Sequence, residues 1–180
     1  MAFLNMHMRS SRLMIEEYRS DEAEAFCETC PGTFTVEQAK EFLGNLADLR
    51  FHAPRSEFDL ALRRREDLKL IGGFELKVTS VYNRQAEIGF WIHPDFRQQG
   101  YAVEATSLML DFAFRKLHMH RVFATCRPEN RGSVRTLEKC GLQQEGRIRG
   151  HFLIKGKWED SLLYAILEDE FEKRRSDQIG

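Results

Sequence analysis

The segment from Arg97 to Ala102, Arg-Gln-Gln-Gly-Tyr-Ala, combines the residue types and the position that an anion-binding loop requires. It falls between an expected strand and an expected long helix, and the first N–H groups of a helix lack an intrahelical acceptor and carry partial positive charge. Gly100 permits backbone torsions that other residues resist, so the loop can turn these N–H groups toward one phosphate. Arg97 and Arg131 could add positive charge there.

The local pattern alone leaves two interpretations open. One glycine before a helix is also typical of a plain connection between a strand and a helix. No Gly-Lys-Ser/Thr follows Gly100, which excludes a Walker A loop, and the lack of a Gly-x-Gly-x-x-Gly pattern removes support for a dinucleotide site. The elements around the loop must decide between an anion site and a simple connection.

Those elements indicate a mixed sheet covered by helices. Apolar residues alternate over the ranges expected to be strands, which are 13–18, 58–63, 68–78, 85–92, 121–127 and a strand pair within 144–167. Helices are expected over 21–30, from the N-cap Thr35 with its capping-box partner Gln38, over 101–118 and over 133–140. Gly72 and Gly73 inside a strand predict a bulge or a close backbone approach.

The order of the elements predicts the strand directions. The early strands are joined by short loops and should pair antiparallel, whereas the strand, helix and strand between 85 and 127 require a crossover and a parallel pair. The fold class is therefore α/β. The polar tail, 168–180, is expected to fray.

The size and charge of the chain exclude several classes of protein. Its 180 residues fit one domain, 1–180, and 42% hydrophobic with 31% charged residues are typical of a globular protein. The 27 Lys and Arg against 28 Asp and Glu give a net charge of −1, which offers no basic field for nucleic acid. No apolar run has membrane-spanning length and no signal peptide is evident, so no membrane partner and a cytoplasmic location are expected.

The four cysteines do not predict a metal or redox site. Cys27 and Cys30 form a Cys-x-x-Cys pair, but Cys126 and Cys140 lack the spacing of a second zinc-binding pair. A redox pair would follow a strand, whereas 21–26 is expected to be helical. Structural or incidental cysteines, and no metal, are therefore expected.

The loop and its surroundings resemble the GNAT N-acetyltransferase superfamily, in particular its RimJ/RimL-type branch. Arg97, Gly100 and Ala102 match the superfamily's acyl-CoA pyrophosphate loop, Gln/Arg-x-x-Gly-x-Gly/Ala. The runs similar to the branch are Ala86-Glu87-Ile88-Gly89-Phe90-Trp91-Ile92-x-Pro94, Gly100-Tyr101-Ala102-Val103-Glu104-Ala105, Asn130-x-x-Ser133, Leu137-Glu138-Lys139-Cys140-Gly141-Leu142 and Glu145-Gly146. The match extends from about 68 to 167 and departs at Cys140 and Leu142. It implies a GNAT fold, with a mixed, mostly antiparallel central sheet, a splayed parallel pair and helices on both faces.

The resemblance also implies an acetyl-CoA-dependent N-acetyltransferase in which an amine attacks the thioester directly. The residues whose main-chain N–H groups would bind the CoA pyrophosphate are Gln98, Gln99, Gly100, Tyr101 and Ala102. The Asn130 amide would bind the pantetheine arm or the acetyl region of CoA. The Ser133 hydroxyl would lie near the CoA sulfur, where it could protonate or orient the leaving thiolate. A backbone N–H on the strand carrying Ile92 would stabilise the oxyanion.

Each side chain with an implied role also has a structural explanation. Asn130 could cap the helix that Ser133 enters, and serine is common in a first helical turn for capping reasons alone. Glu87 could accept the proton of the amine, directly or through water, or be a solvated or salt-bridged strand residue. Glu104 favours the helix dipole from its first turn and is expected to be structural or to orient the substrate.

The sequence does not determine which amine accepts the acetyl group. The resembling branch acetylates protein N-termini, polyamines, amino acids and antibiotics, and a fold does not choose among them. Acidic residues near the first expected helix would favour a cationic amine, or form a solvated face; they are Glu16, Glu17, Asp21, Glu22 and Glu24. The alternative functions are a non-catalytic acyl-CoA-binding sensor and an interaction protein that uses only the scaffold. The edge of the final strand pair would allow a homodimer.

Overall fold

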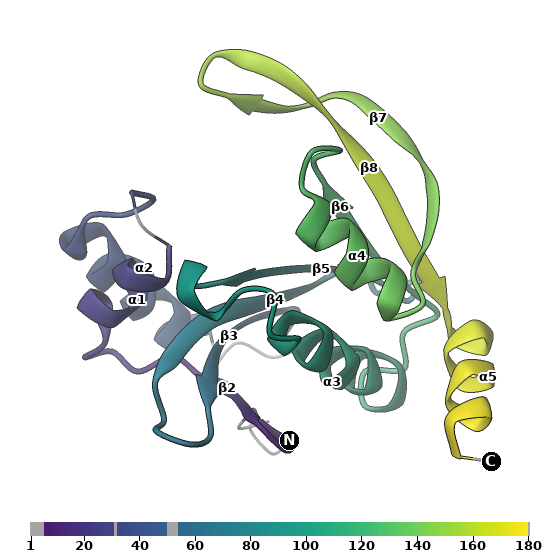
Figure 1. Cartoon of the computed structure of the whole chain (residues 1–180), viewed down its shortest axis with the longest axis horizontal. Coiled ribbons are helices and arrows are strands. Elements are labelled where there is room, and N and C mark those ends of the chain that lie inside the picture. The colour runs from purple at the N-terminus through teal and green to yellow at the C-terminus, as the bar shows by residue number, and fades with distance from the viewer. Residues whose placement is uncertain (1–5, 31, 50–53, 180) are drawn as a thin grey trace. The chain divides into compact units, whose positions relative to one another are not determined.

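The computed structural model describes residues 6–30, 32–49 and 54–179, which fold into strands and helices (Figure 1). The strands are β1 (His7–Arg9), β2 (Leu13–Glu17), β3 (Glu57–Arg64), β4 (Leu70–Ser80), β5 (Gln85–Ile92), β6 (Arg121–Cys126), β7 (Gln143–Ile154) and β8 (Lys157–Leu167). The helices are α1 (Ala23–Thr29), α2 (Val36–Leu49), α3 (Tyr101–Arg115), α4 (Arg131–Lys139) and α5 (Glu168–Ile179), with a short 3-10 helix, η1 (Pro94–Phe96). Within the described ranges, every helix is too short or too polar to cross a membrane.

The strands join one hydrogen-bonded sheet in the order β1-β2-β3-β4-β5-β6-β8-β7. β5 and β6 pair in parallel and α3 forms the crossover between them, as the order of elements predicted. The pairs β1–β2, β2–β3, β3–β4, β6–β8 and β8–β7 are antiparallel. The predicted α/β class with a mixed, mostly antiparallel sheet is therefore confirmed.

The chain divides into two compact units, which share β4, β5 and α3. The first unit comprises Met1–Lys77 and Phe90–Leu108, and the second comprises Val78–Gly89 and Met109–Gly180. The first therefore contains the end of β5, the loop that follows it and the start of α3, whereas the second contains β6, α4 and the β7–β8 strand pair. A single domain over 1–180 stays a prediction.

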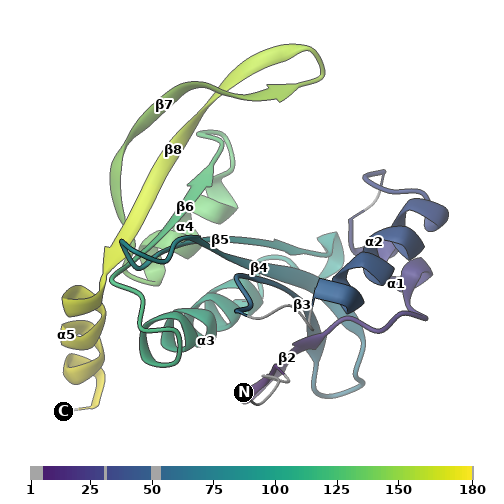
Figure 2. The ribbon, with the colours of Figure 1, turned by 180° about the vertical axis from the view of Figure 1, so that it is seen from behind.

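The core of the first unit gathers around Phe26 in α1. Its ring packs against the rings of Tyr18, Phe34, Phe42 and Trp91, with centroid separations from 5.3 to 6.1 Å. Aromatic pairs are favourable over this range. Figure 2 shows α1 and α2 packed together here. The aromatic core therefore holds both helices against the end of β5.

The start of α2 confirms the expected capping box. The backbone N–H of Thr35 donates to Gln38 Oε1 at 2.9 Å, and the backbone N–H of Gln38 donates to Thr35 Oγ1 at 3.3 Å. Each side chain thus satisfies a donor that the helix itself leaves unpaired.

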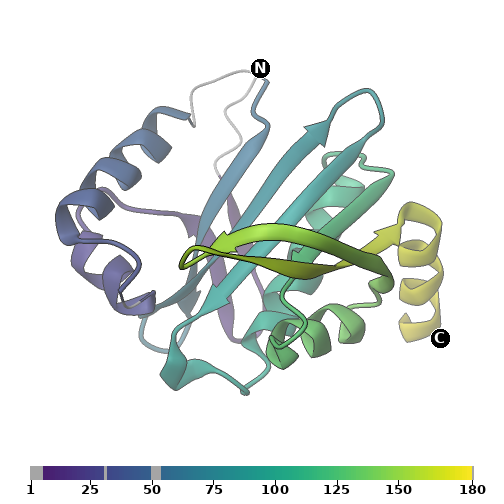
Figure 3. The ribbon, with the colours of Figure 1, turned by 90° about the horizontal axis from the view of Figure 1, so that it is seen from above.

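The strand pair expected within 144–167 is confirmed as a hairpin of β7 and β8. Lys155 and Gly156 connect β7 and β8, with φ of 49° and 78°. Two consecutive positive φ values are the signature of a type I′ turn, which suits the twist of paired strands. Figure 3 shows the hairpin as a twisted two-stranded ribbon.

The expectation that the tail frays is wrong, because it forms α5. Phe171 stacks on Phe114 with ring centroids 4.8 Å apart, and Arg84 binds the Glu168 carboxylate at 2.5 Å. Glu170 Oε2 also accepts the backbone N–H of Leu167 at 2.9 Å, and acidic residues in a first helical turn favour the helix dipole. The aromatic contact and these polar contacts together hold the helix.

The predicted helix over 101–118 is correct at its start and too long at its end. α3 ends at Arg115, and His118 has a φ of 55°, which a right-handed helix cannot contain. The N–H of Leu117 bonds to the Phe112 carbonyl and that of Met119 to Ala113, so the chain wraps around the helix end instead of extending it.

Candidate functional site

The end of β5 is positioned by a close approach of β4. A Cβ atom added to Gly72 would lie closer than 3.0 Å to the Trp91 carbonyl oxygen and 3.1 Å from Ile92 Cα. The N–H of His93 donates to the Ile71 carbonyl at 2.8 Å. The close backbone approach predicted from Gly72 and Gly73 is therefore confirmed, and it fixes the point from which the next loop departs.

The loop after β5 folds back onto the strand end. Arg97 Nε donates to the Ile92 carbonyl oxygen at 2.9 Å, and Gln99 Nε2 donates to the Asp95 carbonyl oxygen at 2.9 Å. Gln98 and Gly100 have φ values of 60° and 86°. Gln98 is one of the few non-glycine residues in the left-handed region, a conformation that costs about 1 kcal/mol or more. Surrounding contacts therefore impose the shape of this loop.

The N–H groups of residues 98–102 form an unpaired row of donors, here named the N–H row. Among the described residues, none accepts a hydrogen bond from these five groups, whereas the N–H of Glu104 already bonds to the Gly100 carbonyl at 3.1 Å. Arg97 and residues 98–100 are exposed. Consecutive free donors at the positive end of a 15-residue helix fit a diphosphate group, which needs several donors at once.

Glu87 lies on β5 in the second unit, where the parallel pair opens. The register of β5 with β6 ends at Glu87, which faces Phe123, and includes neither Ile88 nor Gly89, although β6 continues to Cys126. The half-buried Glu87 carboxylate accepts a hydrogen bond from Thr125 Oγ1 at 3.4 Å. Glu87 therefore lies where the strands begin to splay, with one polar neighbour.

The start of α4 holds three of the predicted residues. Asn130 Oδ1 accepts the backbone N–H of Ser133 at 3.1 Å, so Asn130 caps the helix. Its amide nitrogen and the half-buried Ser133 hydroxyl have no hydrogen-bond partner within residues 6–30, 32–49 and 54–179. Arg131 is exposed. These residues belong to the second unit and the N–H row belongs to the first, so the structure gathers the predicted residues into two groups.

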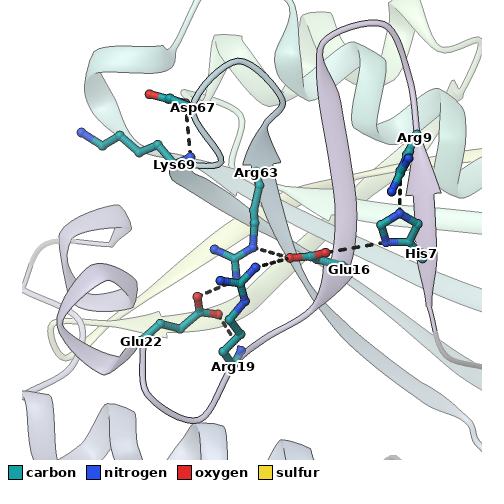
Figure 4. Close-up of polar contacts among 8 residues, drawn as sticks. All are labelled: His7, Arg9, Glu16, Arg19, Glu22, Arg63, Asp67 and Lys69. Carbon is teal, nitrogen blue, oxygen red and sulfur yellow. Dashed lines mark hydrogen bonds and ion pairs between the residues drawn. The ribbon is translucent and has the colours of Figure 1, made fainter.

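Three of the five acidic residues near α1 are paired with arginines, whereas Asp21 and Glu24 are exposed (Figure 4). Arg63, only 3% exposed, binds Glu16 at 2.6 Å and Glu22 at 2.5 Å. Arg19 adds a contact to Glu16 at 3.3 Å, and Glu17 pairs with Arg55 at 2.6 Å. The solvated-face interpretation is therefore wrong for these three glutamates, because Arg63 of β3 and Arg55 just before it pair with them.

Other carboxylates come together on β3 and β4, and the sequence did not reveal them. Asp59 faces Glu75 across the strand pair, and Glu57 lies two residues away on the same face. Burial, followed by the charges of Glu75 and Glu57, raises the pKa of Asp59 from 3.8 to about 6. The alternation along each strand was visible in the sequence, but the register that pairs Asp59 with Glu75 was not.

Asp59→Asn should raise the free energy of unfolding by roughly 1–2 kcal/mol at pH 8, because the amide removes a charge that is partly buried beside Glu75 and Glu57. A carboxyl whose pKa is raised by folding stabilises the fold below its unfolded pKa and loses that contribution as the pH rises through about 6. The gain should therefore disappear near pH 4. Denaturant titrations of both proteins at the two pH values measure it, and an equal effect at both would contradict the assignment.

The four cysteines are unpaired by disulfides. Cys27 and Cys30, one in α1 and one just after it, are free thiols, as are Cys126 and Cys140. Within the part of the chain that the structure describes, His, Cys, Asp and Glu side chains form no group of three or more that could hold a metal ion.

Comparisons with known proteins find acetyltransferases. Residues 11–143 match the family model of the acetyltransferase (GNAT) domain. The uncharacterized N-acetyltransferase YnaD of Bacillus subtilis (strain 168) is 31% identical over 92% of this chain and 99% of its own length. A spermidine N(1)-acetyltransferase of Vibrio cholerae serotype O1 is 30% identical over 58% of this chain and 61% of its own.

A solved structure extends the likeness to the fold. RimJ of Mycobacterium smegmatis, in complex with CoA-disulfide, superposes with a TM-score of 0.76 at 24% identity, over 88% of this chain and 83% of that one. This shows a shared fold with a member of the branch that the sequence resembled. With the family match covering 11–143, the chain belongs to the GNAT acetyltransferase family and is an N-acetyltransferase.

Proposed function

We propose that this protein transfers the acetyl group of acetyl-CoA to a primary amine by direct attack of the amine on the thioester. The observation that carries the proposal is the N–H row: five successive donors at the start of α3 with no acceptor among the described residues. Their number and charge suit the pyrophosphate of CoA. Exposed Arg97 and Arg131 would add cations, and Asn130 has an amide nitrogen left to donate.

Acetyl-CoA supplies an activated acetyl group. The protein must accept a proton from the attacking amine and donate a proton to the leaving thiolate. The amine attacks only when it is neutral, so a base must take its proton, and the leaving thiolate needs a donor. We assign the first role to Glu87 and the second to Ser133, whose hydroxyl has no partner among the described residues. A backbone N–H at Ile92, on the strand end fixed by Gly72, would stabilise the oxyanion.

Ser133→Ala and Glu87→Gln should each lower kcat by about 100-fold and leave the KM for acetyl-CoA within about threefold, because each group acts on the proton in the transition state. Steady-state rates at several pH values measure both effects. If the Ser133 hydroxyl takes no part in the transfer, Ser133→Ala will keep kcat, since the backbone N–H that Asn130 caps is unchanged, and Ser133 would be removed from the mechanism.

The acceptor is proposed to be a cationic primary amine, either a polyamine or a peptide N-terminus. The carboxylates of Asp59 and Glu75 face each other in the first unit, and Glu57 on the same face pairs with Lys77 at 2.7 Å. Gly73 lies two residues before Glu75 on β4, and a Cβ on Gly73 would meet the Trp91 ring and the Tyr18 hydroxyl. The Asp59–Glu75 pair therefore lies on the face of β4 that approaches Trp91, which supports a cationic acceptor. A spermidine acetyltransferase among the relatives is consistent with this acceptor class.

The test mixes the protein with acetyl-CoA and a panel of amines and follows the release of free thiol. The panel contains spermidine, a peptide with an N-terminal Ser or Ala, an aminoglycoside and several amino acids. Release that depends on one acceptor supports the transferase and names its substrate class. Tight CoA binding without release for any amine would favour the non-catalytic sensor instead, and no binding would overturn both.

We also propose that the protein forms a homodimer through the β7–β8 hairpin. β7 is the outer strand of the sheet, and the cross-strand partners Leu153 and Trp158 near its turn are 59% and 69% exposed. Exposed strand edges and paired apolar side chains favour association with a second chain. Sedimentation of the purified protein decides between monomer and dimer.

A further inference from the structure

The turn between β1 and β2 contacts the loop that carries the N–H row, although some 90 residues separate them in the sequence. Arg12 lies in this turn, which is closed by the N–H of Ser10 on the Leu13 carbonyl at 3.0 Å and by the N–H of Leu13 on Ser10 Oγ at 2.9 Å. These two hydrogen bonds hold the backbone of the turn independently of the Arg12 side chain.

Glu104, in the first turn of α3, holds Arg12 with both carboxylate oxygens. Oε1 accepts the backbone N–H of Arg12 at 3.1 Å and the hydroxyl of Ser10, and Oε2 accepts Nε at 2.8 Å and pairs with Nη2 at 2.6 Å. The Glu104 side chain is 16% exposed. Burial acts to raise the pKa of this carboxyl, but the hydrogen bonds from Ser10 and Arg12 more than offset it, so the pKa lies below its usual value.

The remaining end of the Arg12 guanidinium reaches the loop itself. Nη1 donates to the carbonyl oxygen of Gln99 at 2.9 Å, and the guanidinium lies over the ring of Tyr101, 4.7 Å from its centroid. A Cβ added to Gly100 would lie 3.3 Å from Nη2. Arg12 thus contacts three consecutive residues of the N–H row and uses a different nitrogen for the loop than for Glu104.

The hydrogen bond to Gln99 determines where an N–H group points. The Gln99 carbonyl and the Gly100 N–H belong to one planar trans peptide, so they point in opposite directions. When Arg12 binds the Gln99 carbonyl, the N–H of Gly100 points away from Arg12. The hydrogen bond also prevents the Gln99–Gly100 peptide from rotating and presenting its carbonyl oxygen to an anion. An exposed glycine with a φ of 86° would otherwise be free to rotate this peptide.

We propose that Arg12, held by Glu104, is a positioning residue that sets the orientation of the Gln99–Gly100 peptide and thereby the affinity of the N–H row for the pyrophosphate of CoA. The inference rests on the proposed function, because it requires that the N–H row binds the pyrophosphate of CoA. Arg12 and Glu104 contact the loop and not the reacting atoms. The inference also gives Glu104 a defined role: the carboxylate orients an arginine and does not contact the substrate.

The test compares Arg12→Gln with Arg65→Gln in the full chain. Arg65 Nη1 donates to the Ser10 carbonyl at 2.7 Å and to that of Ser11 at 3.3 Å, so it supports the same turn without touching the loop. Arg12→Gln should raise the KM for acetyl-CoA and the calorimetric Kd for CoA by about 10-fold to 100-fold, the range for loss of a charged hydrogen bond. Both constants should stay within about threefold in Arg65→Gln.

The truncated substrate S-acetyl-pantetheine separates positioning from a general loss of structure, because it lacks the pyrophosphate. In Arg12→Gln, kcat/KM for this thioester and the KM for the amine should change by less than about threefold. Arg12→Lys should resemble Arg12→Gln, since one ammonium cannot bind Glu104 and Gln99 together as a guanidinium does. Glu104→Gln should reproduce the effect, and the double variant should show less than the summed loss.

Three results would overturn the inference: equal losses with acetyl-CoA and S-acetyl-pantetheine, equal losses in the Arg12 and Arg65 variants, or an unchanged Kd for CoA in Arg12→Gln. A failure of the proposed function is recognised separately. In that case the unaltered protein itself would neither bind CoA nor release thiol, whatever residue stands at position 12.

Discussion

Gly100→Val should weaken CoA binding and raise the KM for acetyl-CoA by about 100-fold, the scale of an error of about 1 Å in a binding loop. Gly100 has a φ of 86°, a region that a β-branched residue does not adopt without strain, and a Cβ there would lie 3.3 Å from Arg12 Nη2. The substitution therefore displaces both the N–H row and the arginine that orients it. Calorimetry with CoA measures the loss.

The matched control for this prediction is Gly156→Val. Gly156 has a φ of 78° in the β7–β8 turn, and no atom lies within 4 Å of the position of its Cβ. Valine at position 156 would have the same kind of backbone strain, at a position far from the N–H row in the sequence. A similar loss of CoA affinity in both variants would show that strain alone, and not the loop, explains the effect.

Gly72→Ala should lower the free energy of unfolding by about 3 kcal/mol or more, the upper part of the range for overpacking a buried site. The new Cβ would lie closer than 3.0 Å to the Trp91 carbonyl oxygen, a backbone atom that cannot turn aside. β4 and the end of β5 would have to separate. Denaturant unfolding monitored by tryptophan fluorescence measures the change.

Gly44→Ala provides the opposite case for comparison. Gly44 lies in α2 with no atom within 4 Å of its Cβ position, so alanine should raise the free energy of unfolding by about 0.5–1 kcal/mol through helix propensity. A change of less than about 1 kcal/mol in Gly72→Ala would contradict the close approach that positions Ile92.

The features predicted correctly from the sequence are those set by neighbouring residues. The alternation over 85–92 predicted β5 with the bounds that the structure has, and Thr35 with Gln38 predicted the start of α2. Gly100 before a helical pattern marked the loop. In each case local chain geometry and the helix or strand period determine the outcome, so a stretch of ten residues contains the necessary information.

The features that the sequence did not reveal depend on residues far apart in the chain. Arg12 meets Glu104, Arg63 meets Glu16 and Asp59 faces Glu75 only after the sheet has its register. The prediction for the tail was wrong for the same reason, because the polar segment is held by the contact of Phe171 with Phe114 from another helix. A single sequence shows the charges but not which pairs the fold brings together.

The measurement that tests the central claim most directly is a crystal structure of the protein with CoA. The account predicts pyrophosphate oxygens about 2.7–3.2 Å from backbone nitrogens of the N–H row, residues 98–102, with Arg12 still bound to the Gln99 carbonyl. CoA bound with its pyrophosphate elsewhere, or a row in which those nitrogens bond to protein atoms instead, would contradict it.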